Sequence, residues 1–515
     1  MEFLLSIILI LTRFFDFITD PIFKYKAKKR QYLPPLKDDD LLRIKASDLA
    51  EKIRNQQITC VDVCECYINR IKEVNPYINA VVEDRFKEAR REAKLVDGYL
   101  RTTSLSLYEV KTFKPLLGVP VTIKESCLVK GLSIAVGLRS RIGFKAEVDG
   151  DVVARLKRSG AIVLLVSNVP ELVFGWETVN HLIGYTNNPY DTTCTAGGSS
   201  GGEGALLGAG ASLIGIGSDM AGSIRLPALF NGVFGHKPTP KTVSVKGHWP
   251  MCENCKFHEV LVLGPLARFA TDLMLMMKVI CSDKMCLELK LDETVDLSKL
   301  NIFFIEQFDG SITLPKVSEE IQSAVRQAVN YLKKECKASV MDYKFQAFQK
   351  SLVICASELY SQKDIPNLLK SNNTNIFIEV IKVIFGKSNF TMNLLFSYIT
   401  KSFYNCFVGD YSKDNDLMKN EVMAKLGTNG VIIMPTSIGA AHKHNQIYFR
   451  LIYPYLILAN ALGLPSTSVP CGFDKNGMPI GIQVMAAPYQ DRLCLAVAEE
   501  LEKLFGGWVP PPEKS

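Results

Sequence analysis

Two short stretches decide the fold of this chain: Gly197-Gly198-Ser199-Ser200-Gly201-Gly202-Glu203-Gly204 and Ser218-Asp219-Met220-Ala221-Gly222-Ser223-Ile224-Arg225-Leu226-Pro227. Five of the first eight residues are glycine, which costs backbone entropy in a helix or strand. We therefore expect this stretch to be a turn, not a helix, that brings backbone N–H groups close to another group. The small residues 205–217 predict a short helix and a strand, and 224–230 predicts another helix. Two serine-bearing turns joined by a buried connector indicate a nucleophile site.

Two common loop chemistries fit the first stretch poorly. A phosphate-binding P-loop needs a lysine and then serine or threonine after its last glycine, and that lysine is missing. The segment 198–202 does match the G-x-S-x-G nucleophile elbow, with Ser200 as the nucleophile. An elbow must follow a buried strand, however, whereas residues 187–194 have the Asn, Pro, Asp and Thr content of a loop. The pentapeptide alone is therefore a weak signal.

A third interpretation explains more of the chain. Lys124 follows the apolar run 118–123 and lies 75 residues before Ser199. Ser199 in turn lies 24 residues before Ser223. In these three ordered motifs the chain resembles the amidase signature family over about residues 40–510. It is most similar to the membrane-associated fatty-acid amide hydrolases of that family, in particular those of type 2. Further matching segments are Asn187-Asn188-Pro189, Phe230-Asn231-Gly232-Val233-Phe234, Phe234-Gly235-His236-Lys237-Pro238, Pro479-Ile480-Gly481-Ile482-Gln483 and Phe505-Gly506-Gly507-Trp508-Val509.

The resemblance implies roles for the residues of these motifs. A serine hydroxyl is a poor nucleophile until a base takes its proton. The resemblance makes Ser223 the acyl nucleophile, Ser199 the residue that relays its proton, and Lys124 the final base, with Ser199 on a cis peptide bond. Lysine can serve as a base when burial lowers its pKa, whereas the six histidines lack the context of a catalytic triad.

The resemblance also implies an oxyanion hole in the second turn, formed by the backbone N–H groups of Met220, Ala221, Gly222 and Ser223. Ser200 is expected to form hydrogen bonds within the site without acting as the nucleophile. Many family members have glycine at the position of Ala221, so a left-handed backbone there would be strained by about 1 kcal/mol. No metal or cofactor is expected. Cys252 and Cys255 form a C-x-x-C, but a zinc site would need a second pair of ligands.

For the fold, the length of 515 residues suggests about three domains as a soft rule. The resemblance instead implies one catalytic domain over 46–515. The composition of the preceding residues predicts a linker at 31–45 and a membrane-anchor segment at 1–30. The class is α/β, a large mixed twisted sheet with helices on both faces. Periodicity agrees: it predicts helices within 47–105 and at 152–159, 318–340 and 491–505, and strands at 118–123, 161–166, 431–436 and 465–470.

The N-terminal segment and residues 365–408 carry the membrane prediction. Residues 3–12 are apolar, but ten residues fall short of the roughly 20 that span a bilayer. Counting through residue 23 gives a marginal span, and five basic residues follow within 21–30. Residues 376–396 are rich in Phe, Ile and Leu with lysines between them, which suits either a membrane surface or two core helices. We expect an intracellular membrane, such as the endoplasmic reticulum or lipid droplets.

Charge and the motifs together limit the function. The net charge of +7 is concentrated in residues 21–30, and no nucleic-acid motif accompanies it, so no nucleic-acid partner is expected. The expected reaction is hydrolysis of amides, in particular long-chain fatty-acid amides, to a fatty acid and an amine. The alternatives are a general small-amide amidase, a catalytically silent membrane-bound binding protein and an amidotransferase-like subunit. The resemblance is also compatible with a homodimer.

Overall fold

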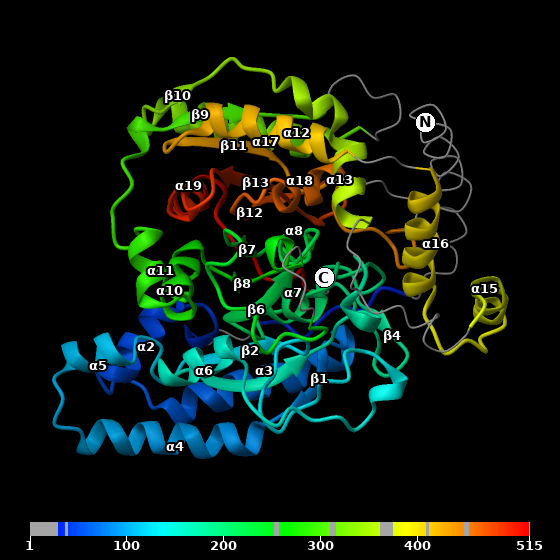
Figure 1. Cartoon of the computed structure of the whole chain (residues 1–515). Coiled ribbons are helices and arrows are strands. Elements are labelled where there is room, and N and C mark those ends of the chain that lie inside the picture. Colours follow the sequence, from blue (N-terminus) through cyan, green and yellow to red (C-terminus); the bar gives the residue numbers. More distant parts are fainter. Residues whose placement is uncertain are drawn as a thin grey trace.

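The computed structural model describes residues 29–36, 40–251, 257–308, 316–360, 374–407, 411–447 and 453–513 (Figure 1). The predicted membrane-anchor segment therefore lies almost wholly outside the described residues, and so do Cys252 and Cys255. Among the helices that are described, none combines the length and the apolar character needed to cross a membrane.

A mixed sheet forms the centre of the described structure, which confirms the predicted fold class (Figure 1). The three strands β3, β2 and β6 run parallel, as do β11, β9 and β10, and the other neighbouring pairs are antiparallel. Its eleven strands are, in spatial order, β1 (Val81–Asp84), β3 (Ile162–Ser167), β2 (Pro120–Lys124), β6 (Ile214–Asp219), β8 (Val262–Ala267), β7 (Phe234–Lys237), β12 (Ser466–Phe473), β13 (Pro479–Ala486), β11 (Gly430–Pro435), β9 (Asn301–Phe304) and β10 (Ser339–Val340). A separate hairpin pairs β4 (Val179–Asn180) with β5 (Gly184–Tyr185).

Helices cover both faces of this sheet. Seven of its strands are therefore buried at every residue: β2, β3, β6, β7, β8, β11 and β13. One row of packed helices comprises α6 (Asp151–Arg158), α10 (Ala270–Ile280), α19 (Asp491–Phe505) and α12 (Glu319–Lys334). A second row comprises α3 (Cys60–Ile78), α7 (Gly201–Gly208) and α8 (Arg225–Phe230). Around these lie α2 (Ala46–Arg54), α4 (Phe86–Thr102), α5 (Leu107–Phe113), α9 (Phe257–Val260), α11 (Asp283–Glu288), α13 (Ser351–Tyr360), α15 (Ile376–Ile384), α16 (Met392–Phe407), α17 (Ser412–Leu426) and α18 (Tyr453–Ala461).

Most of the predicted elements are confirmed within a few residues. The strands expected at 118–123, 161–166, 431–436 and 465–470 correspond to β2, β3, β11 and β12. Two predictions need correction. The interval 47–105, predicted to be helical, also contains the strand β1, which is only four residues long and lies between two long helices. The helix expected over 318–340 ends at Lys334. The chain then turns, so that Ser339–Val340 pairs with β9 at the edge of the sheet.

The glycine-rich stretch also differs from its prediction, because α7 begins inside it at Gly201. These glycines serve close packing within a helix. A Cβ on Gly201 would lie 2.3 Å from Thr178 Oγ1, and one on Gly202 would lie 2.5 Å from the backbone nitrogen of Asn168. Contacts this short would force neighbouring groups apart, so only glycine lets α7 approach the segments beside it.

The predicted linker is docked on the domain where it is described. Leu33 and Leu36 are buried in the main core, and Arg70 Nη1 donates to the carbonyls of Pro34 and Pro35 at 3.0 and 3.2 Å. The apolar region beyond residue 374 divides into two unlike helices at one side of the molecule (Figure 1). In α16 the side chains of Leu394 and Leu395 are wholly buried, as in a core helix, whereas α15 exposes much of its apolar surface.

Candidate active site

Lys124 is the last residue of β2, and its side chain is wholly buried. Its Nζ lies 2.7 Å from Ser199 Oγ, 2.9 Å from Ser218 Oγ and 3.3 Å from the carbonyl oxygen of Ser218. Burial disfavours the ammonium form and lowers the pKa of Lys124 from 10.5 to about 7, although Cys127, Asp219 and Glu203 oppose this shift. The amine is therefore poised to exchange a proton near neutral pH.

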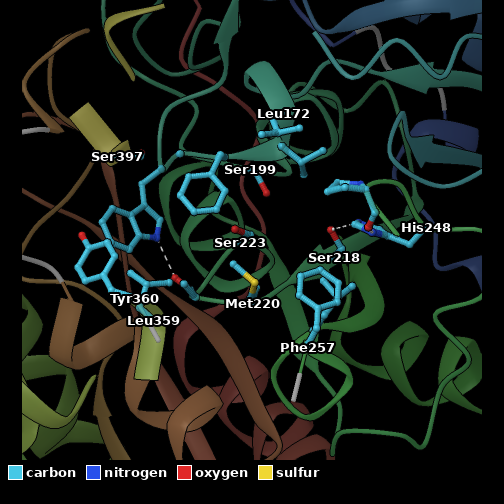
Figure 2. A pocket seen from close by; sticks show the side chains of 17 residues that line it. Leu172, Ser199, Ser218, Met220, Ser223, His248, Phe257, Leu359, Tyr360 and Ser397 are labelled. Atoms are coloured by element: carbon cyan, nitrogen blue, oxygen red, sulfur yellow. Dashed lines mark hydrogen bonds between the residues drawn. The ribbon is translucent and has the colours of Figure 1, made fainter. Parts of the chain in front are cut away.

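Ser199 and Ser223 line the same cavity, into which Figure 2 shows both side chains pointing. Ser199 lies two residues before α7, and the Gly198–Ser199 peptide bond is cis, as the resemblance implied. Ser223 is the more accessible of the two, whereas Ser199 is only 3% exposed. Within the described residues no hydrogen bond joins the two hydroxyls. The structure thus brings all three predicted residues together but links only Lys124 and Ser199 directly.

The turn that carries Ser223 is shaped by one buried carboxylate. Asp219 accepts hydrogen bonds from the N–H groups of Gly222 and Ile224 at 2.7 and 3.1 Å, and from Arg225 Nε and Nη2, both at 3.1 Å. Burial alone would raise the pKa of Asp219, but the Arg225 guanidinium and these donors outweigh it and lower the pKa to about 2. The carboxylate is therefore charged at any working pH and holds the turn closed.

The predicted oxyanion residues divide into two groups. Met220 and Ala221 line the cavity, and across the described structure the N–H groups of Ala221 and Ser223 have no hydrogen-bond acceptor. Gly222 differs, since its N–H is taken by Asp219 and its backbone is left-handed, with φ +96°. Ala221 is not in the left-handed region, so the strain considered for this position does not arise.

Ser200 does not occupy the place that the elbow interpretation requires. Its side chain is fully buried, and Ser200 is not among the described residues that line the cavity. Its N–H donates to the carbonyl of Ser223 at 3.2 Å, and its hydroxyl donates to the carbonyl of Ser218 at 3.4 Å. Ser200 therefore ties the two turns together from behind the site.

The rest of the cavity wall is largely apolar (Figure 2). It is formed by the segment around the 3₁₀ helix Glu171–Val173, by the second turn, and by α9, α13 and α16. The tryptophan of this wall is fixed by a hydrogen bond of 2.8 Å from Trp176 Nε1 to the carbonyl of Ala221. The apolar and aromatic lining residues are Leu172, Val173, Phe174, Trp176, Met220, Ala221, Pro250, Phe257, Leu261, Leu359 and Tyr360.

Sequence reasoning missed two polar residues of the site, Ser218 and His248. Both line the cavity, and His248 Nε2 lies 3.0 Å from Ser218 Oγ (Figure 2). The sequence did carry a signal for Ser218. The strand that ends at residue 219 runs parallel to the strand that ends at Lys124, so the two strand ends lie at the same edge of the sheet. His248 carried no such signal. His236 lies elsewhere in the core, where its ring nitrogens contact Thr467 Oγ1 and Asp491 Oδ1 at 2.8 and 3.2 Å.

Comparisons with known proteins identify the relatives of this chain. The family model described as Amidase matches residues 62–495. Fatty-acid amide hydrolase 2-B of Danio rerio is 37% identical over 498 residues, 94% of each chain, and fatty-acid amide hydrolase 2 of Homo sapiens is 37% identical over 486 residues, 92% of this chain and 91% of the relative. A solved structure titled fatty acid amide hydrolase has the same fold, with a TM-score of 0.71 at 23% identity, and covers 91% of this chain and 86% of that one. The protein is an amide-hydrolysing enzyme of the amidase signature family.

Proposed function

We propose that this enzyme hydrolyses long-chain fatty-acid amides through an acyl-enzyme formed on Ser223. The observation that carries the proposal is the 2.7 Å contact between Lys124 and Ser199 in an apolar cavity that Ser223 also lines. The relatives named as fatty-acid amide hydrolases support this substrate class.

In the proposed reaction, neutral Lys124 takes the proton of Ser199 while Ser199 takes the proton of Ser223. The Ser223 oxygen attacks the amide carbon, and hydrogen bonds of this kind often tighten only when substrate is bound. The proton then returns through Ser199 to the leaving amine, because an amine departs badly as an anion. Water next attacks the acyl ester with the same base, which releases the fatty acid and restores Ser223.

The N–H groups of Ala221 and Ser223, which have no acceptor among the described residues, are suited to bind the negative charge on the carbonyl oxygen in the transition state. Met220, on the same turn, is the third residue of the proposed oxyanion hole. Gly222 contributes indirectly, since its N–H faces Asp219 and fixes the direction of the neighbouring peptide groups. Donors held in place before the reaction stabilise the transition state without a cost of reorganisation.

The proposed preference for long acyl chains rests on the apolar walls and on α15. Phe377 and Ile381 on α15, and Phe385 directly after it, follow one another at helical spacing and are 77%, 56% and 71% exposed. This helix packs against α16, which contributes Ser397 to the cavity wall. We propose that the exposed stripe docks on an intracellular membrane, such as the endoplasmic reticulum or a lipid droplet. A lipid amide would then pass from the membrane towards the site.

A homologous series of monounsaturated primary amides, kept below their micelle concentrations, tests this substrate class. Each buried methylene contributes about 0.8 kcal/mol. Remote binding energy of this kind can orient the carbonyl and raise kcat/KM. We expect kcat/KM to climb with acyl length and then level off. A flat or falling dependence would leave a general small-amide hydrolase instead.

A further inference from the structure

A chain of hydrogen bonds leads from Lys124 away from Ser199. Lys124 Nζ lies 2.9 Å from Ser218 Oγ, Ser218 Oγ lies 3.0 Å from His248 Nε2, and His248 Nδ1 lies 3.4 Å from the carbonyl oxygen of Pro250. A carbonyl oxygen only accepts, so Nδ1 carries the proton and Nε2 is left as an acceptor. Burial, and then the nearby Lys124, lower the pKa of His248 to about 3, so the ring is neutral during catalysis.

The imidazole is held in this position by the segment that follows Lys124. The N–H of Leu128 donates to the carbonyl of Gly247 at 2.8 Å, and the N–H of Trp249 donates to the carbonyl of Ser126 at 2.7 Å. These bonds flank His248 on both sides, and its side chain is only 3% exposed. The lysine and the histidine are thus fixed on paired segments, and Ser218 lies between their side chains.

This arrangement decides where the lone pair of Lys124 points. A neutral amine has two N–H groups and one lone pair. The hydroxyl and carbonyl oxygens of Ser218, at 2.9 and 3.3 Å, can accept both N–H groups, which leaves the lone pair for Ser199. The Ser218 hydroxyl accepts in this way only while its own proton points elsewhere, and Nε2 of His248 receives that proton.

We propose that His248 is a positioning residue, which acts through Ser218 to keep the lone pair of Lys124 directed at Ser199. The inference rests on the proposed Ser-Ser-Lys mechanism. Without an acceptor at position 248, the Ser218 hydroxyl can turn and donate to Lys124, which occupies the lone pair and removes the base from Ser199. His248 touches neither Lys124 nor Ser199 in this role, so its effect depends entirely on Ser218.

Steady-state kinetics on a short, soluble amide test the proposal. His248→Phe keeps a flat ring but removes the acceptor, and we expect kcat to fall about tenfold, the rate equivalent of one hydrogen bond, with KM unchanged. His248→Gln restores an acceptor oxygen and should recover most of kcat. In a Ser218→Ala background, His248→Phe should cause no further loss. Full activity of His248→Phe, a changed KM or an additional loss in that background would overturn the proposal.

The pH profile separates positioning from loosened packing. A Ser218 hydroxyl that donates to the neutral amine favours the neutral form, so the acidic limb of kcat/KM should move to lower pH in His248→Phe. Water admitted by loosened packing would move it to higher pH, which would contradict the proposal. The other titratable groups that face Lys124 are Cys127, Asp219 and Glu203, and both variants leave them in place.

Lys124→Ala, assayed in parallel, distinguishes failure of the proposed base from failure of the proposed role of His248. If Lys124→Ala keeps its activity, the proposed base is wrong and the role of His248 fails with it. If Lys124→Ala is inactive while His248→Phe behaves like the unaltered enzyme, only the inference about His248 is overturned.

Discussion

Lys124 Nζ and Ser199 Oγ lie 2.7 Å apart, although 75 residues separate them in the chain. The contact forms because Lys124 ends β2, which pairs in parallel with β6, and Ser199 lies just before α7, which packs against both strands. Lys124 is fully buried and, among the described residues, contacts hydroxyl groups and forms no ion pair, so its pKa stays low. A basic amine needs this property near neutral pH.

The first prediction concerns pH. The pKa of Lys124 is lowered to about 7 and its neutral form is the active one, so kcat/KM should fall as pH drops below about 7 and level off above it. Glu203 is a second buried group whose pKa lies at about 7, raised by its burial. Glu203→Gln is therefore the matched control and should keep an acidic limb. A profile whose limb disappears in Glu203→Gln would assign the titration to the carboxyl group instead.

The second prediction concerns the turn that carries Ser223. Gly222→Ala places a Cβ 2.7 Å from Leu456 on a backbone with φ +96°. Left-handed strain and overpacking together should destabilise the protein by about 2–4 kcal/mol and reduce kcat/KM more than 100-fold. Gly477→Ala, with φ +74° and no neighbour within 4 Å, carries the backbone strain alone. Urea unfolding and the soluble-amide assay should separate the two variants, and equal effects would show that close packing at Gly222 is unimportant.

The third prediction concerns membrane binding by α15. Phe377→Asp combined with Ile381→Asp should weaken binding to phospholipid vesicles by about 100-fold, because two exposed apolar side chains can then no longer be buried in lipid. The comparison is made in a chain without residues 1–28, so that the predicted anchor does not mask the effect. Tyr108→Asp is the control, since Tyr108 on α5 is 80% exposed but lies on another element. Sedimentation with vesicles measures the difference, and equal binding of all the variants would remove α15 from the membrane surface.

Much of the site could be predicted because its residues sit in contiguous motifs. Lys124, Ser199 and Ser223 each belong to a short pattern whose spacing is visible in the sequence, and Lys124 ends the buried strand β2. Their meeting in one cavity follows from the parallel pairing of β2 with β6.

Other features depend on contacts that the sequence does not record. The loop of His248 is positioned by backbone hydrogen bonds to Ser126 and Leu128, and no local pattern shows such pairing. The hydrogen bond from the Gly222 N–H to Asp219, which removes this N–H from the oxyanion hole, likewise depends on how the turn closes around the carboxylate. The start of α7 at Gly201 was missed because the entropic cost of glycine in a helix is offset there by close packing.

Ser223 is the proposed site of acylation. Labelling the enzyme with a fluorophosphonate and mapping the modified serine by mass spectrometry tests this role directly. We expect one adduct on Ser223, which is absent from Ser223→Ala and still forms in Ser200→Ala. An adduct on Ser200 that persists in Ser223→Ala would overturn the role of Ser223 and establish the elbow interpretation.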